Sequence, residues 1–150
     1  TDISMNAAKQ AKSLDLLSKI ASLVVTFRTE FNQAVADFNP WSSDSATQNM
    51  ADPDSIDISF SFGGQHSGFH SRCILIQIRF SEALLAPNCR IVCIQASLDI
   101  HKGEQWQLAT IGNWEFEGVN QPISFCQEKF RRFCRQVFVL FRSPIHLNCW

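Results

Sequence analysis

Apolar residues recur at helical spacing through the first third of the chain. The residues that share a spacing of three or four are Leu17, Ile20, Val24, Phe27, Phe31, Ala34 and Phe38. This spacing predicts one face of a long α-helix, and further apolar neighbours widen it beyond a coiled-coil seam. Asn39-Pro40 ends the pattern, because the residue before a proline is disfavoured in helical space. We expect this face to pack into the core; a seam for self-association is the alternative.

Four runs with alternating apolar and polar residues follow, at residues 56–62, 73–80, 91–100 and, less regularly, 105–116. Such alternation is typical of strands with one apolar face. The connections between the runs are too short for a helical crossover, so an antiparallel meander is predicted.

The second and third runs also predict a register. Folding them about Ala86 gives the pairs Ile76 with Ala96, Ile78 with Ile94, Gln77 with Gln95, and Arg79 with Cys93. The first two pairs then share the apolar face and the last two share the other face. A slip by two residues would preserve this arrangement, because side chains alternate with a period of two.

A second amphipathic helix is predicted between Pro122, which suits a first helical turn, and the Ser143-Pro144 pair. The fold class is therefore α+β, in a single domain over residues 1–150. A long N-terminal helix, a four-stranded antiparallel meander and a C-terminal helix are expected, with both helices packed on one face of the sheet. Residues 40–55 are polar and are expected to form a mobile loop.

Composition supports a folded protein, because hydrophobic residues make up 45% of the chain and charged residues only 18%. The formal net charge of -1 predicts no overall attraction to nucleic acid or to an anionic membrane. No segment has the ~20 consecutive apolar residues of a membrane span. We therefore expect no membrane partner and no strong nucleic-acid signal.

Cysteine spacing argues against a disulfide framework. Cys126 and Cys134 lie on one predicted helix, about 12 Å apart along its axis, which exceeds the reach of a disulfide. Buried free thiols in a reducing cytoplasm are expected. The N-terminus lacks the order of a signal peptide, although a removed signal stays an open alternative.

The segment between the first two runs contains Gly63, Gly64, His66, Gly68 and His70. It does not match a phosphate-binding loop, and a strand rather than a helix follows it. We expect a hairpin turn, in which glycines supply positive φ. Two histidines on a turn lack the geometry of a helical metal pair, so no metal and no cofactor are predicted.

Catalytic motifs are equally weak. The chain has no G-x-S-x-G sequence, and the nearest thiol–imidazole pair along the chain is Cys73 with His70. No catalytic residue is therefore assigned. Enzymatic activity stays open, with a non-enzymatic role favoured.

The face of the sheet away from the helices, called the second face below, is the leading candidate surface. Its expected members are Asp57, Ser59, Ser61, Cys73, Leu75, Gln77, Arg79, Ile91, Cys93, Gln95 and Asp99. Apolar side chains on a face that no helix covers suggest an interface or a ligand site.

Three hypotheses follow for a protein of unknown function. The first is a small intracellular protein-interaction or self-association module, such as a homodimer, that uses Arg79, Gln77, Gln95, Leu75 and Ile91. The second is a small-molecule-binding protein or enzyme whose pocket lies between the sheet and loop 40–55, with Arg79, His70 and Trp41 in its lining. The third is contact with an anionic partner through the basic residues Lys129, Arg131, Arg132 and Arg135.

Overall fold

The computed structural model describes residues 6–40, 54–62, 73–82, 84, 86, 89–98 and 106–142. Its helices are α1 (Ala7–Gln10), α2 (Leu14–Glu30) and α4 (Ser124–Leu140). Its strands are β1 (Ala34–Asp37), β2 (Ser55–Phe62), β3 (Cys73–Phe80), β4 (Ile91–Leu98), β5 (Trp106–Ala109) and β6 (Phe116–Gly118). Trp41, His66, His70 and most of loop 40–55 lie outside the described residues.

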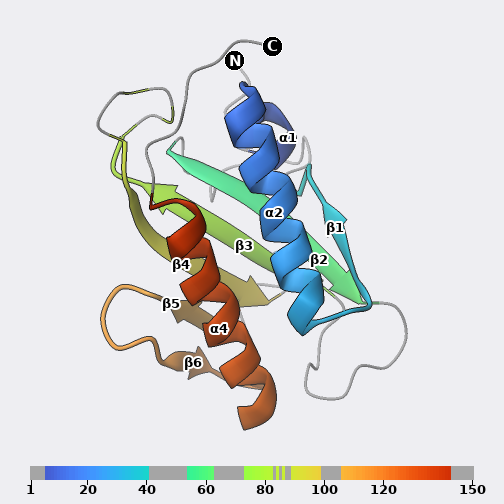
Figure 1. Cartoon of the computed structure of the whole chain (residues 1–150). Coiled ribbons are helices and arrows are strands. Elements are labelled where there is room, and N and C mark those ends of the chain that lie inside the picture. The colour runs from blue at the N-terminus through green and yellow to red at the C-terminus, as the bar shows by residue number, and fades with distance from the viewer. Residues whose placement is uncertain are drawn as a thin grey trace.

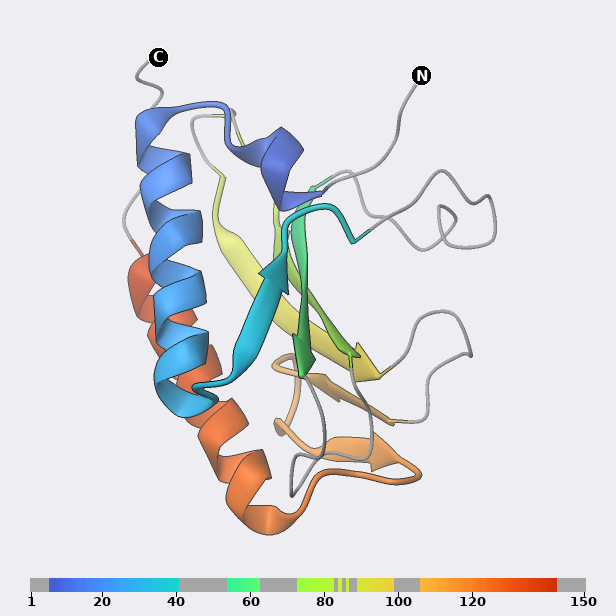
Figure 2. The same ribbon diagram turned by 90° about the vertical axis from the view of Figure 1, so that its right-hand side faces the viewer.

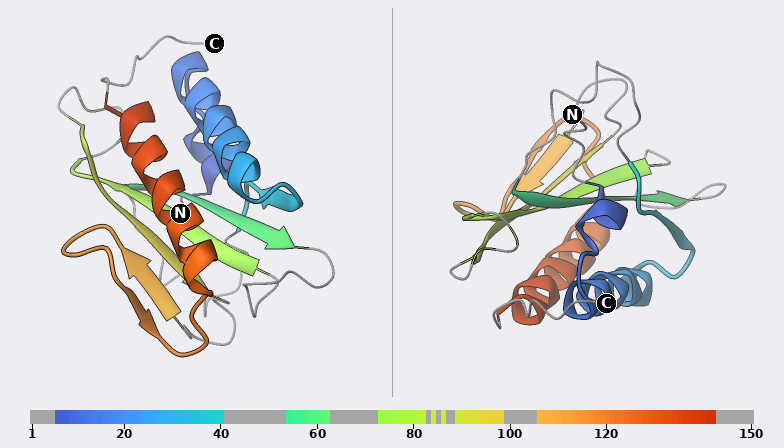
Figure 3. Two further views of the ribbon diagram at one scale, coloured as in Figure 1. Left: turned by 60° about the horizontal axis from the view of Figure 1, so that its bottom comes forward. Right: turned by 90° about the horizontal axis from the view of Figure 1, so that it is seen from above.

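The six strands form one antiparallel sheet in the order β1-β2-β3-β4-β5-β6. Helices α2 and α4 lie side by side on one face of this sheet, as Figures 1 and 2 show. Seen from above, both helices are below the sheet (Figure 3). The predicted α+β class with both helices on one face is confirmed, but the predicted number of four strands is wrong.

One additional strand comes from the end of the predicted N-terminal helix. Helix α2 ends at Glu30, and β1 pairs with β2 so that Ala34 lies opposite Phe62 and Ala36 opposite Phe60. The spacing of Phe31, Ala34 and Phe38 fits a helix, but alternate residues also fit a strand. Pairing with the edge of β2 satisfies the backbone there, and this tertiary interaction overrides the local pattern.

The other additional strand results from a turn inside the predicted fourth run. Strands β5 and β6 form a hairpin, with Leu108 opposite Phe116. In the connection Gly112 has a φ of 93° and Trp114 a φ of 59°. Glycine adopts positive φ readily, so Gly112 permits the chain to reverse where the sequence analysis expected it to continue.

The predicted register of β3 and β4 is confirmed, including Gln77 opposite Gln95 and Arg79 opposite Cys93. The pairing shifts at the next residue, where Phe80 lies opposite Ile91. Ile91 consequently packs against the hydrophobic core rather than on the second face. The expectation for Ile91 was wrong because a strand irregularity reverses the alternation of side chains.

Aromatic rings fill the core between the helices and the sheet. Phe27 of α2 stacks on Phe60 of β2, with ring centroids 3.8 Å apart, and meets Phe133 of α4 edge-on at 5.0 Å. Phe130 also reaches Phe133, Phe116 and Trp106 by edge contacts. These contacts tie both helices to the sheet.

The N-terminal segment closes part of the β2 edge that β1 leaves open. Asn6 forms a parallel bridge with Asp57, and the Gln10 side-chain amide donates a hydrogen bond of 2.8 Å to the Ser55 carbonyl. Ser13 then begins α2, because its hydroxyl accepts a hydrogen bond from the Leu16 amide at 3.1 Å. None of the described helices has the length and apolar character needed to cross a membrane.

Candidate functional site

The strand register aligns the second-face side chains in rows across the sheet. One row contains Asp57, Gln77, Gln95 and Ala109 from β2 to β5. The next row contains Asp37, Ser59, Leu75, Ser97, Gln107 and Glu117 and crosses all six strands. Asp57, Ser59, Gln77 and Gln95, which the sequence assigned to this face, are therefore brought together. Asp99, which was also expected there, lies outside the described residues.

Over β2 and β3 these side chains are buried. Leu75 is 2% exposed and Gln77 is 7% exposed, and Asp57 and Ser55 are fully buried. The Ser55 hydroxyl donates a hydrogen bond of 2.7 Å to the Asp57 carboxylate. A partner protein would not reach Leu75 or Gln77 in this structure, although the composition had suggested an interface there.

Arg79 lies half-buried at the centre of the predicted site, with both predicted glutamines beside it. Its Nε donates a hydrogen bond to the Gln95 side-chain carbonyl, and its Nη2 donates to that of Gln77 at 3.3 Å. The two amides thus hold the guanidinium fork in one orientation. This arrangement fixes a cation at the sheet surface, and His70 and Trp41, which were expected beside it, lie outside the described residues.

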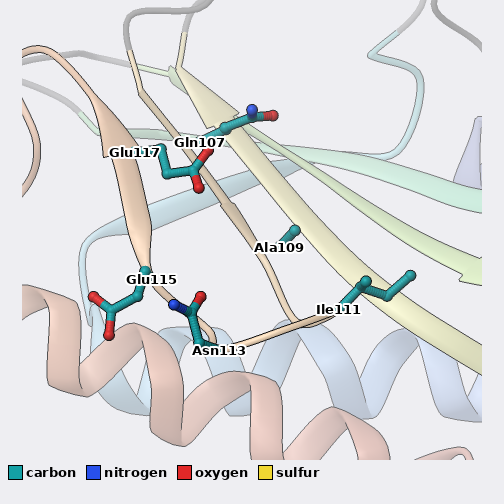
Figure 4. Close-up of a pocket in the computed structure, with 6 residues that line it drawn as sticks. All are labelled: Gln107, Ala109, Ile111, Asn113, Glu115 and Glu117. Atoms are coloured by element: carbon teal, nitrogen blue, oxygen red, sulfur yellow. The ribbon is translucent and has the colours of Figure 1, made fainter.

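The β5–β6 end of the second face is different, because its side chains are exposed. Gln107, Glu115 and Glu117 are exposed, and Ile111 is 62% exposed. Together with Ala109 and Asn113 they line a hollow of about 260 Å³, part of which is open solvent. Figure 4 shows Ala109 between the other five side chains.

We call this site the hairpin hollow, and sequence reasoning missed most of it. Glu115 and Glu117 attract notice as two carboxylates on one strand face, but Gln107 and Asn113 reach them only through the hairpin. The signal was Gly112-Asn113, a pair of residues typical of turns. Taking those residues as a turn would have predicted two strands with Gln107 opposite Glu117.

Helix α4 holds the hairpin in place through Phe138 and Arg131. The Phe138 ring stacks on Trp114, with centroids 5.8 Å apart. Arg131 Nε donates a hydrogen bond of 3.2 Å to the Trp114 carbonyl, and its guanidinium lies over the Phe116 ring at 5.3 Å. Positive φ at Trp114 is uncommon for a bulky residue, and these contacts stabilise it.

The remaining basic residues of α4 also make internal contacts. Arg132 forms a two-pronged ion pair with Glu30, with N–O distances of 3.0 and 3.1 Å. Lys129 donates to the Glu30 carbonyl at 3.0 Å and lies over the rings of Phe31 and Phe125. Both residues therefore join the first half of α4 to the end of α2.

Arg135 pairs with Glu128 at 3.5 Å on the exposed side of α4. Glu128 also lies 3.8 Å from Arg131. The four residues of the predicted basic cluster thus have different contacts. Arg131 anchors the hairpin, Lys129 and Arg132 join the two helices, and Arg135 forms an exposed ion pair.

Three of the described thiols are poor nucleophiles at neutral pH. Burial raises the pKa of the Cys134 thiol to about 12, and burial also raises the pKa of Cys126 and of Cys89. A thiol that stays protonated does not attack, since the thiolate is the reactive form. Cys89 and Cys134 are buried free thiols, as predicted for these two. Within the described part of the chain no three metal-ligating side chains cluster.

Comparison with known proteins leaves the assignment at the level of the family. Neither a curated protein nor a solved structure matches the chain. Residues 8–143 match a protein family that is described as a domain of unknown function, and this match covers most of the chain. The chain therefore belongs to that family, a domain of unknown function.

Proposed function

We propose that this chain is a non-enzymatic protein-interaction module whose contact surface is the hairpin hollow. The observation that carries the proposal is the change of exposure along one face of the sheet. Gln77 and Ser97 are buried, whereas Gln107 and Glu117, farther along the same face, are exposed. The proposed contact surface is therefore still on the second face, but it lies at the β5–β6 hairpin and not at β3, where the sequence predicted it.

The size and chemistry of the hollow favour a basic side chain of a partner polypeptide. Only about 50 Å³ of it can be entered by a water-sized molecule, far below the roughly 300–1,000 Å³ of typical small-molecule sites. Glu115 and Glu117 supply carboxylates, and Ile111 supplies apolar surface for a methylene chain. A lysine or arginine side chain combines an apolar stem with a cationic end, so it matches both parts.

Anchoring of the hairpin by α4 supports this function. The contacts of Trp114 with Phe138 and Arg131 restrain the backbone that carries Asn113 and Glu115. A restrained site loses less conformational entropy when a partner binds, so more of the contact energy contributes to affinity.

A small-molecule pocket around Arg79 is the second candidate, and the geometry supports it less. The Arg79 fork already donates to Gln77 and Gln95. A carboxylate or phosphate ligand would have to replace these hydrogen bonds before it gained its own.

The experiment that tests the proposal is an NMR titration with short lysine-containing peptides. We expect amide shifts at Gln107, Glu115 and Glu117, and loss of these shifts in Glu117→Lys. Glu82→Lys is the matched control, because Glu82 is exposed and lies outside the hollow. It changes the net charge equally and should leave the shifts unchanged.

Two outcomes would contradict the proposal. Wild-type protein without shifts at the hollow would exclude a basic side chain as its occupant. Equal effects of Glu117→Lys and Glu82→Lys would reduce the interaction to overall charge. If the partner is a second copy of the chain, sedimentation equilibrium should show a mass above 17.0 kDa that Glu117→Lys lowers.

A further inference from the structure

The segments that contain α2 and α4 have a positive net charge, although the net charge of the whole chain is slightly negative. We define the helix layer as residues 12–31 and 122–142, which contain α2, α4 and their flanks. It contains eight basic and three acidic residues, a net charge of +5. Since the whole chain carries -1, the remaining residues carry -6.

Ion pairs inside the layer account for its acidic residues. Asp15 pairs with Lys19 at 3.1 Å. Glu30 pairs with Arg132, as described above, and Glu128 with Arg135. Five basic residues remain after every carboxylate of the layer has a partner. Lys129 and Arg131 make the internal contacts described above, and the other three, Lys12, Arg28 and Arg142, are exposed.

An apolar stripe runs along the outer side of α2. Leu14, Leu17, Ala21 and Val25 follow one another at spacings of three, four and four, so they share one side of the helix. All four are exposed, Val25 at 66%. The opposite side of α2 is packed into the core, and a helix that is apolar on both sides is typical of one covered on both sides.

Helix α4 extends this exposed apolar surface. Phe125, in its first turn, and Val139, in its last turn, are 65% and 52% exposed. They lie 14 residues apart, about 21 Å along the helix axis. The views in Figures 1 and 2 show α2 and α4 side by side along the same face of the sheet.

We propose that the helix layer binds the surface of a membrane that contains anionic lipids. On such a surface the exposed basic side chains contact anionic head groups, and the exposed apolar side chains insert toward the acyl chains. The apolar and basic residues extend along the whole layer, whereas a protein interface concentrates its binding energy in a central cluster. A nucleic-acid backbone would use the cations but offer nothing to Leu14, Val25 and Val139.

This inference goes beyond the proposed protein interaction, because it concerns the opposite side of the sheet. The hairpin hollow is on the second face, and the helix layer covers the other. A partner and a membrane could thus be bound together. The expectation of no membrane partner rested on the total charge and on the lack of a membrane-spanning segment. The total charge does not show that the helix layer is cationic, and binding at a membrane surface needs no spanning segment.

The test is co-sedimentation of the full chain with phosphatidylglycerol vesicles and with phosphatidylcholine vesicles. We expect binding only to the former, weakening as salt is raised. Arg28→Gln with Arg142→Gln should lower the affinity, by about fivefold for each charge removed. Arg90→Gln is the control, since Arg90 is exposed outside the helix layer.

A matched valine pair tests the apolar part of the proposal. Val25 and Val35 are 66% and 63% exposed, but only Val25 belongs to the helix layer. Val25→Gln should weaken vesicle binding several-fold and Val35→Gln should not. Thermal unfolding of each variant checks that the fold is kept.

Three results would overturn the membrane proposal. The first is a wild-type chain that does not sediment with phosphatidylglycerol vesicles. The second is equal loss in the two valine variants. The third is binding to polyglutamate or DNA without binding to vesicles, which would assign the cationic layer to an acidic protein or to a nucleic acid.

Discussion

The two faces of the sheet over β2 and β3 are both buried, but different interactions hold them. On the helix side Ile56, Ile58 and Phe60 belong to the buried core that also contains residues of α2 and α4, and their side chains carry no polar group. On the second face Asp57 and Gln77 are also buried, with hydrogen bonds from Ser55 and Arg79.

Burial alone therefore does not define a core. Apolar burial stabilises roughly in proportion to area and has little directional requirement. A buried polar side chain contributes only when its partners are in place, and losing one partner leaves the other unsatisfied. The helix side should therefore respond to lost volume, and the second face to lost partners.

The largest expected effect is on the helix side. Phe27→Ala removes the ring that stacks on Phe60 and meets Phe133, and it should lower the free energy of unfolding by about 3–5 kcal/mol. Urea denaturation measures this change. Phe38→Ala is the control, because Phe38 is 38% exposed and should cost about 1 kcal/mol or less. Similar losses in both variants would contradict a core centred on Phe27.

A smaller effect is expected on the second face. Asp57→Ala leaves the buried Ser55 hydroxyl without this acceptor and should cost about 1–3 kcal/mol. The double variant Ser55→Ala with Asp57→Ala should cost less than the sum of the single variants, because both partners are removed together. Strict additivity would show that this pair does not help to hold the second face. Asp37→Ala, at an exposed position of β1, is the control.

The smallest expected effect, when it is measured over the first pH unit above 9.0, is a pH dependence on the helix side. Burial raises the pKa of Cys134 to about 12, whereas the unfolded thiol ionises near its ordinary 9.0. The unfolded chain therefore releases a proton first, and stability should fall as pH rises from the ordinary value toward the folded one. The slope from one thiol is about 1.4 kcal/mol per pH unit at most. Cys134→Ala should reduce this slope in alkaline urea titrations, and an unchanged slope would exclude Cys134 as its source.

Much of the fold could be predicted because alternation and helical spacing are local properties. The register of Gln77 with Gln95 and the amphipathic α4 both follow from the order of apolar residues. The position at which α2 ends could not be predicted in this way, because Ala34 and Ala36 fit a helix and a strand equally well. Pairing with the edge of β2 makes this segment a strand. The position of Ile91 also required the irregular pairing at Phe80.

The candidate sites show the same division. Sequence alone brought Arg79, Gln77 and Gln95 together, because strand pairing fixes neighbours across a sheet. It could not tell that Gln77 is buried while Gln107 is exposed, since burial depends on what lies above a face. It also could not show that the helix layer is cationic, because this layer combines residues of α2 and α4 that lie far apart in the chain.

The alternating strands, the apolar face of each helix and the polar character of the second face can all be read from local residue spacing. Each of these depends on residues within a few positions of one another, where backbone geometry sets the spacing. Three other properties follow from tertiary contacts alone: which end of the second face is exposed, how α4 anchors the hairpin, and which charged residues belong to the helix layer. Those properties depend on contacts such as Arg131 with Trp114 and Arg132 with Glu30, which join segments 17 and 102 residues apart.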